Sequence, residues 1–361
     1  MTQLLTYPDI DPQQWQALID RSPYATWFQT KEAYEFYAAL SSELIPFAFG
    51  IEECRGDEAM RQLGDKDGSR LVGVIVGYIT RERNAIKQYF TRRAIIIGGP
   101  VIDNDATAEE VAALLNAVKK LQRSDLQPKG RTTATRSTGL SPIYIETRNF
   151  HDYSRWKEVF ETCGFLYQPH YDIHVHCNAQ HQMSERRQRE LKRAIKNGAM
   201  VCEAQTEQEV RDWYQILHRL YREKVRTPLF SEEFFLQFYR NGVGKYLLVK
   251  KDDKVIGGMI CPILPGKAIY EWYVCGLDEE YRELSPSVVA THAAIEYAKE
   301  NGLPLFDFMG AGEPEFPYGV RDFKMEFGGE LKEFGRFLCI RKPLLYWIGK
   351  IGVKWLKRRY I

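Results

Sequence analysis

The residues best suited to chemistry gather in residues 306–330, which read FDFMGAGEPEFPYGVRDFKMEFGGE. This stretch combines an acidic residue in a predicted strand (Asp307), a glycine-rich exit (Gly310) and a lysine (Lys324) that follows an aromatic residue, Phe323. Glycine lets the backbone approach a ligand closely. A lysine between aromatic rings is partly desolvated and could polarise a carbonyl or stabilise an oxyanion. The same pattern also fits a surface lysine whose stem lies along apolar side chains.

Familiar catalytic motifs are absent from the sequence. Four histidines (His170, His174, His176 and His181) fall within twelve residues, but no HExxH pattern accompanies them. We interpret them as partly exposed strand residues and predict no metal site. The sequence also lacks GxxxxGK[ST], GxGxxG and GxSxG. These absences argue against a phosphate loop, a dinucleotide fold and a serine hydrolase.

Composition places the chain among ordinary globular proteins. Its 361 residues, 44% hydrophobic and 27% charged, are enough for two domains. The net charge of +2 predicts no DNA partner. Seven scattered cysteines without a CxxC pair suit a reducing compartment. With neither a leader-like N-terminus nor a run of about 18 apolar residues, the sequence predicts a cytoplasmic protein.

The two halves of the chain repeat one order of elements. Strand signals, an amphipathic helix and a further strand occupy residues 46–102, 105–122 and 143–150. The second half gives a strand pair at 244–264, a strand at 267–277, a helix at 285–302 and a strand at 305–311. Chance alternation remains the alternative. The pattern predicts a layered α/β (α+β) fold with domains at 1–178 and 179–341, because 171–177 alternates like a final strand. Residues 342–361 follow as a helix.

The motif FDFMG followed by FKMEFGG resembles the signature of the Fem-type (FemAB-like) bacterial peptidoglycan aminoacyltransferases, in which a DFGG-like strand end precedes FKxxFG. Three further stretches are similar to the same family. They are ATWFQTKEAYEF at 25–36, with Tyr34 where tryptophan is commoner, RRQRELKRAIKNGAMV at 186–201, and the strand–helix unit at 270–302. Together the matches span most of the chain.

The resemblance implies two tandem GNAT-like domains, each a mixed sheet flanked by helices. It implies transfer of an aminoacyl or acyl group from an activated donor to an amine of a cell-wall precursor. Lys324 would stabilise the carbonyl under attack, while the strand from Tyr270 to Tyr273 and Gly310 would line the cleft. No tightly bound cofactor is expected, since the donor is a co-substrate.

Two departures leave the donor open between aminoacyl-tRNA and acyl-CoA. The chain lacks the long helical hairpin that some tRNA-using members carry. It also has YRELSPS where GNAT proteins place a pyrophosphate loop.

Attack of an amine on an ester or thioester requires proton removal, oxyanion stabilisation and two substrates held close. Asp307, Glu271 and Tyr273 are candidates for proton handling, although a strand-end carboxylate can equally make a structural hydrogen bond. Other residues are candidates for binding substrate phosphates or an acidic acceptor. These are Ser285, the predicted N-cap, and Ser287 at the N-terminus of the 286–300 helix, Arg226 in a loop, and Arg186 and Arg189 on a basic helix. Each arginine could instead be a solvated surface residue.

The C-terminal residues 342–361 predict a basic amphipathic helix with Leu344, Leu345, Ile348, Ile351 and Trp355 on one face. Peripheral membrane contact and packing on the second domain are both open. The first domain has no counterpart of Lys324, so we expect it to act as scaffold or to recognise the acceptor.

The leading hypothesis is therefore an acyl or aminoacyl transferase of the cell envelope. The alternatives are an inert binding protein for a nucleotide-sugar precursor or tRNA, and an ordinary CoA-dependent N-acetyltransferase.

Overall fold

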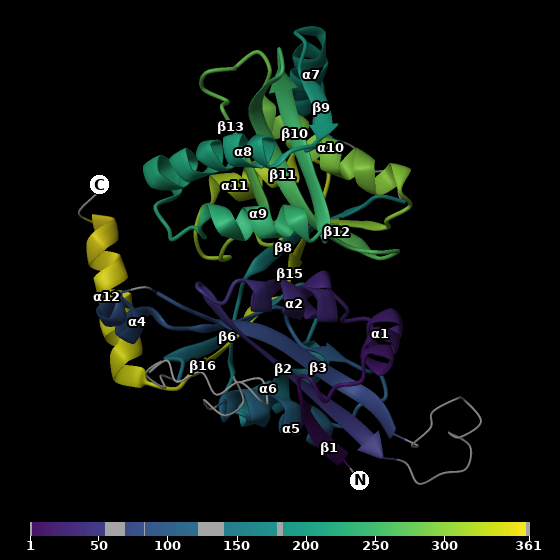
Figure 1. Ribbon diagram of the computed structural model, residues 1–361, viewed down its shortest axis with the longest axis vertical. Helices are drawn as coiled ribbons and strands as arrows, with labels where there is room; N and C mark the ends of the chain where they lie inside the picture. The colour runs from purple at the N-terminus through teal and green to yellow at the C-terminus, as the bar shows by residue number, and fades with distance from the viewer. Residues whose placement is uncertain (1, 55–68, 83, 122–140, 179–182, 359–361) are drawn as a thin grey trace. The chain divides into compact units, whose positions relative to one another are not determined.

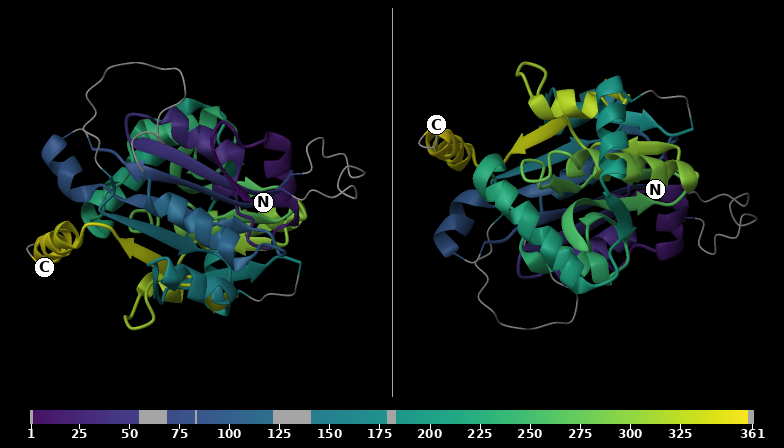
Figure 2. Two further views of the ribbon diagram at one scale, coloured as in Figure 1. Left: turned by 90° about the horizontal axis from the view of Figure 1, so that it is seen from below. Right: turned by 90° about the horizontal axis from the view of Figure 1, so that it is seen from above.

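The computed structural model describes residues 2–54, 69–82, 84–121, 141–178 and 183–358 (Figure 1). The chain forms two compact units. The first contains the residues up to Gln168 together with those from Phe334 onward, and the second is Pro169–Glu333. Each unit is a mixed β-sheet flanked by helices, which confirms the predicted α/β class (Figures 1 and 2). No helix in the described ranges is long and apolar enough to cross a bilayer.

The sheet of the first unit has the strand order β1-β2-β3-β4-β6-β16-β7, and β5 also pairs with β3. The pair β4–β6 is parallel and the others are antiparallel. The strands are β1 (Thr2–Thr6), β2 (Leu44–Cys54), β3 (Ser69–Thr80), β4 (Ala94–Gly98), β5 (Val101–Ile102), β6 (Tyr144–Asn149), β7 (Leu166–Gln168) and β16 (Arg336–Ile340). The helices are α1 (Pro12–Arg21), α2 (Lys31–Ala39), α4 (Ala85–Thr91), α5 (Ala108–Lys119), α6 (Lys157–Thr162) and α12 (Pro343–Arg358), with short 3-10 turns at Trp27–Gln29 and Ser154–Trp156.

The second unit has an equivalent sheet, β9-β10-β11-β12-β14-β8-β15, and β13 also pairs with β11. Its strands are β8 (Tyr171–His176), β9 (Met200–Glu203), β10 (Gly244–Lys251), β11 (Lys254–Leu264), β12 (Ala268–Tyr270), β13 (Tyr273–Gly276), β14 (Leu305–Asp307) and β15 (Glu330–Glu333). Its helices are α7 (Glu185–Lys196), α8 (Glu207–Leu220), which continues as a π-helical turn Tyr221–Val225, α9 (Glu232–Arg240), α10 (Pro286–Glu300) and α11 (Gly319–Met325). In both sheets one strand is broken in two and its first part pairs in parallel with the next strand, as β4 does with β6 and β12 with β14.

The domain boundaries differ from the predicted ones. Residues 171–176 form β8, which pairs with β14 and β15 of the second sheet and does not complete the first sheet. Conversely, β16 pairs with β6 and β7 of the first sheet. The first unit thus receives a strand from after residue 333, and the boundaries fall at Gln168 and Glu333 rather than at 178 and 341. Alternation along a strand shows which face is buried but not which sheet it joins.

Local signals explain where several elements begin and end. Thr107 and Glu110 form a capping box at the start of α5, whose Leu114 and Leu115 are fully buried in the core of the first unit. In the second unit, Asp252 and Asp253 both have positive φ (47° and 62°) in the tight turn between β10 and β11. Such a turn suits the twist of two antiparallel strands. These elements agree with their predicted positions.

Gln29, the glutamine of the FQ motif, is buried and joins two strands of the first sheet. Its side-chain amide donates to the carbonyl oxygens of Val76 (2.8 Å) and Ile97 (2.8 Å), and its Oε1 accepts from the Val76 N–H (2.7 Å). The motif therefore satisfies buried backbone groups between β3 and β4.

Candidate active site

The sheet of the second unit opens after Tyr270 and Asp307. Up to that point β12 and β14 pair in parallel, and the last bond runs from the Glu271 N–H to the Asp307 carbonyl oxygen (2.8 Å). Beyond it, the Trp272 N–H donates to Ile260 of β11, whereas the Phe308 N–H donates to Ile173 of β8 (3.0 Å). The two strand ends therefore follow different neighbours and separate.

Lys324 of α11 connects these two strand ends. Its Nζ lies 2.6 Å from the Phe308 carbonyl oxygen, 2.9 Å from that of Gly310 and 3.1 Å from Glu271 Oε1. An ammonium has three N–H donors, so these acceptors account for all of them. Lys324 is only 7% exposed, which rules out the surface-lysine interpretation. In this structure it fixes the exit of β14 beside the buried carboxylate.

Glu271 is the carboxylate best placed to take a proton. It is buried, and its Oε2 has no hydrogen-bond partner in the part of the chain that the structure describes. Burial raises the pKa of Glu271, the Lys324 ammonium opposes that rise, and the charge of Asp307 adds to it. A carboxyl whose pKa is raised in this way has the basicity that a general base needs near neutral pH.

Asp307 belongs to a second buried cluster next to this pair. His174 Nε2 lies 3.5 Å from Asp307 Oδ2 and 3.9 Å from Asp172 Oδ2. The other oxygens are engaged by the backbone: Asp172 Oδ1 accepts from the Gly310 N–H (2.8 Å), and Asp307 Oδ1 accepts from the Met309 N–H (2.6 Å). The cluster therefore supports the irregular backbone at Met309 and Gly310, where φ is 57° and 119°.

The cluster holds protons more tightly than free side chains do. Burial and the neighbouring Asp307 raise the pKa of Asp172 from 3.8 to about 7. Burial lowers the pKa of His174, but Asp307 and Asp172 outweigh it and the net direction is upward. One ligand atom from each of the three residues lies within 4.8 Å of the others, so this set could also hold a cation. The sequence-based prediction of no metal site stays a prediction.

The interpretation of the histidines as partly exposed is wrong for His174. That side chain is buried because β14 and β15 cover both edges of β8. His176 is exposed and His170 half-buried, while His181 lies outside the described residues. Sequence reasoning missed Asp172 and His174 as site residues. The available signal was their i, i+2 spacing, which puts both on one face of the strand.

Tyr270, Tyr273 and Phe323 have packing roles around the opening. Tyr270 is 1% exposed. The Tyr273 ring is half-buried and packs against Phe235, with ring centres 5.2 Å apart. Phe323 packs against Phe327, with ring centres 5.3 Å apart, and the Arg187 guanidinium lies 4.4 Å from the Phe323 ring centre.

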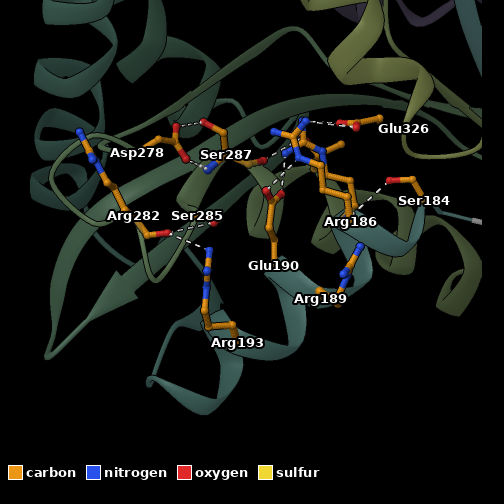
Figure 3. Close-up of polar contacts among 12 residues, drawn as sticks. Ser184, Arg186, Arg189, Glu190, Arg193, Asp278, Arg282, Ser285, Ser287 and Glu326 are labelled. Carbon is orange, nitrogen blue, oxygen red and sulfur yellow. Dashed lines mark hydrogen bonds and ion pairs between the residues drawn. The ribbon is translucent and has the colours of Figure 1, made fainter.

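The N-terminus of α10 is occupied by a carboxylate. Asp278 Oδ1 accepts from the Ser287 N–H (3.1 Å) and its Oδ2 from the Ser287 hydroxyl (Figure 3). Ser285, predicted as the N-cap, has left-handed backbone (φ 40°, ψ 58°) and makes no side-chain cap bond. Its hydroxyl instead donates to the Arg282 carbonyl oxygen. A donor phosphate at this terminus would meet the charge of Asp278, contrary to our expectation.

A hollow of about 620 Å³ lies near this end of α10, lined by Asn197, Lys251, Asp252 and residues 279–284. None of its lining residues belongs to the Lys324–Glu271 pair or to the buried cluster.

The basic helix α7 is anchored by an arginine that the predictions did not single out. Arg187 is buried and pairs with Glu190 and Glu326, both at 2.6 Å. Arg186 and Arg189 are exposed, and Arg186 also pairs with Glu190 (3.3 Å) and Glu326 (3.4 Å) (Figure 3). Arg226 is also exposed, in left-handed backbone (φ 54°) after the π-helical turn, and donates to the Glu223 carbonyl oxygen.

Residues 180–325 match the family model described as the acetyltransferase (GNAT) domain. All of the matched residues lie in the second unit. The crystal structure of FemX is similar with a TM-score of 0.66 at 13% identity, over 96% of this chain and 99% of that chain. L-PGS from Bacillus licheniformis is similar at 0.53 and 11% identity, over 94% and 96%. A tandem GNAT protein from the clavulanic acid biosynthesis pathway is similar at 0.52 and 10% identity, over 94% and 98%.

These likenesses are of fold, given the low identities, and they extend over almost the whole chain. They confirm the predicted tandem GNAT fold and the resemblance to the Fem type at that level. No curated protein matches the sequence. In the second unit, which has the GNAT-like fold, the opening between β13 and the exit of β14 is the candidate active site.

Proposed function

We propose that this protein transfers an acyl or aminoacyl group from an activated ester or thioester donor to an amine of a cell-envelope component. The observation that carries the proposal is the opening of the GNAT-domain sheet at Glu271 and Asp307, bridged by Lys324. The envelope acceptor is supported by the Fem-type signature in residues 306–330 and by the fold likeness to FemX.

Glu271 would act as the general base. As the amine nitrogen attacks the donor carbonyl carbon, its proton passes to Glu271 Oε2. Collapse of the tetrahedral intermediate breaks the bond to the donor oxygen or sulfur, which takes that proton from Glu271 and leaves as the alcohol or thiol. Lys324 would give up one acceptor for the developing oxyanion. If Lys324 donates to the substrate oxygen in place of Glu271, Glu271 loses the ion pair that lowers its basicity. The proposed roles of Lys324 and Glu271 therefore reinforce each other.

The donor proposed first is an aminoacyl ester, such as aminoacyl-tRNA. This choice is supported by Asp278, because its carboxylate already accepts from the Ser287 N–H at the start of α10 and would repel a phosphate group there. The second candidate is a CoA-dependent acetyltransferase, favoured by the description of the matching family model. Both candidates use the same base and the same opening.

The first experiment measures thermal shifts with acetyl-CoA, CoA, UDP-MurNAc-pentapeptide and aminoacyl-tRNA. Stabilisation by the precursor or the tRNA would support an aminoacyl ester as the donor. Stabilisation by CoA compounds alone would favour a CoA-dependent acetyltransferase instead. A binding-only protein would be stabilised without turning over any donor and acceptor pair.

Glu271→Gln tests the base with whichever pair turns over. We expect kcat to fall by about 10²- to 10⁴-fold, the usual contribution of a general base, with substrate affinity within about twofold. Because the pKa of Glu271 is raised, the wild-type rate should climb with pH through that pKa, and the variant should lose this dependence. Glu280→Gln is the matched control on an exposed pair with Arg219. Full turnover by Glu271→Gln would remove Glu271 as the base.

A further inference from the structure

The C-terminal helix α12 presents a row of apolar side chains to solvent. Leu344, Trp347, Ile348 and Ile351 are 74%, 58%, 45% and 66% exposed. Their spacing of three, four and seven residues puts them on one side of the helix. Leu345, which the sequence placed on this face, is half-buried instead. The row is therefore a surface and not part of the core of its unit.

The opposite side of α12 holds the helix onto the first unit. The Tyr346 ring packs edge-on against Tyr144 of β6, with centres 5.4 Å apart. Gly349 faces α4, since a Cβ there would lie 3.8 Å from the Phe90 carbonyl oxygen. The helix is thus fixed in orientation, with its apolar row turned outward.

Helix α4, which packs beside α12, extends this surface (Figure 1). Its last residues include Tyr89 and Phe90, which are 44% and 40% exposed. Segments far apart in the sequence therefore bring large exposed apolar side chains to adjacent helices. Exposed apolar groups that gather in this way mark interaction sites more often than isolated ones do.

The charge around this surface has a single sign. Residues 341–361 contain seven lysines and arginines and no acidic residue. The Lys350 ammonium lies 5.2 Å from the Tyr346 ring centre and 5.8 Å from that of Trp347. Its stem can follow the apolar row while its charge stays at the edge.

From these observations we propose that α12 and the end of α4 dock on an anionic lipid surface. An exposed row with tryptophan, on a C-terminal segment whose charged residues are all basic, is the pattern of a helix that lies in the plane of the bilayer interface. Anionic headgroups complement the charge, and the acyl boundary receives the apolar row. The proposal does not rest on the transferase activity.

The test is co-sedimentation of the full chain with phosphatidylcholine vesicles that contain or lack phosphatidylglycerol. We expect binding to the anionic vesicles and at least about tenfold weaker partition for Trp347→Glu with Ile351→Glu, because charge on an interfacial helix face is costly. Leu166→Glu is the matched control, a 60% exposed leucine on β7 of the same unit. Circular dichroism establishes that each variant is folded.

Two further arms separate the sources of binding. Glu271→Gln should bind the vesicles like the wild type, so loss of catalysis and loss of docking are distinguishable. Equal partition of the double variant, or equal binding to vesicles without phosphatidylglycerol, would overturn the proposal. Concentration-dependent dimers that Trp347→Glu abolishes, without vesicle binding, would assign the surface to self-association and overturn it too.

Discussion

Replacing Asp172 by asparagine should make the second unit more stable at high pH relative to the wild type. The asparagine Oδ1 can keep the bonds that Asp172 Oδ1 accepts from Ile173 and Gly310. What the substitution removes is the charge that burial and Asp307 make costly. A group whose folded pKa is raised contributes stability at low pH that is lost as pH rises through the folded value.

The size of the effect follows from the pKa of Asp172, which rises from 3.8 to about 7. At about 1.36 kcal/mol per pKa unit, this rise of about 3 corresponds to roughly 4 kcal/mol between about pH 4 and pH 7. The interaction of the Asp172 carboxylate with His174 offsets part of this cost, so we expect about 2 kcal/mol. His174 has the same sign, because its pKa is also raised.

The assay is urea denaturation of wild type and Asp172→Asn at about pH 4.5 and about pH 8. The unfolding free energy of the variant minus that of the wild type should be about 2 kcal/mol larger at the higher pH. This corresponds to about 4–8 °C in a melting experiment. Asp253→Asn, on the turn between β10 and β11, removes a carboxylate outside the cluster and should show no such change. A stability difference between variant and wild type that does not change with pH would refute the inference that this cluster holds a proton.

Two further predictions concern the first unit. Burial alone would raise the pKa of Glu146, but Arg148, Arg336 and Arg93 hold it below 4.5, so its contribution is present above that value and lost as pH falls. Glu146→Gln should therefore cost roughly 3 kcal/mol near pH 7 and less in acid, measured by urea denaturation; a cost that does not shrink in acid would contradict the ion-pair account. Gly335→Ala should cost about 3 kcal/mol, because φ is 66° and a Cβ would lie 2.2 Å from the Tyr167 ring. Gly266→Ala, at φ 70° with open space around it, is the control and should cost only about 1 kcal/mol, so equal losses would count against the clash.

Local chemistry made the helices and hairpins predictable. The basic helix ends at Asn197 and Gly198 (φ 88°), and Ser184 caps its start by accepting from the Arg187 N–H. The strand pair predicted at 244–264 turns at Asp252 and Asp253. Lys324 and Asp307 were singled out from residues 306–330 and Glu271 from an earlier strand, and the structure brings Lys324 and Glu271 into contact.

Long-range pairing was not predictable in the same way. Nothing in residues 171–176 shows that they join the second sheet, since the pairing of β8 is decided by the edges of β14 and β15. The same pairing buries His174, so one error about the sheet produced the error about the site. Ser285 is the N-cap residue as predicted but makes no side-chain cap bond, because Asp278, outside the helix, accepts from the Ser287 N–H instead.

A comparison of the two sheets supports placing the proposed chemistry in the second unit. At the corresponding opening of the first sheet, between β5 and the exit of β6, the Tyr153 hydroxyl lies 3.2 Å from the Gly98 carbonyl oxygen and 2.7 Å from that of Pro100. Gly99 has φ 78°, and a Cβ there would meet the Tyr153 ring. This opening is filled by a neutral, buried side chain, whereas the second holds a charged pair with one carboxylate oxygen unbonded. Packing thus closes the opening in the first sheet, whereas the second sheet keeps the carboxylate that we propose as the base, which supports a scaffold role for the first unit.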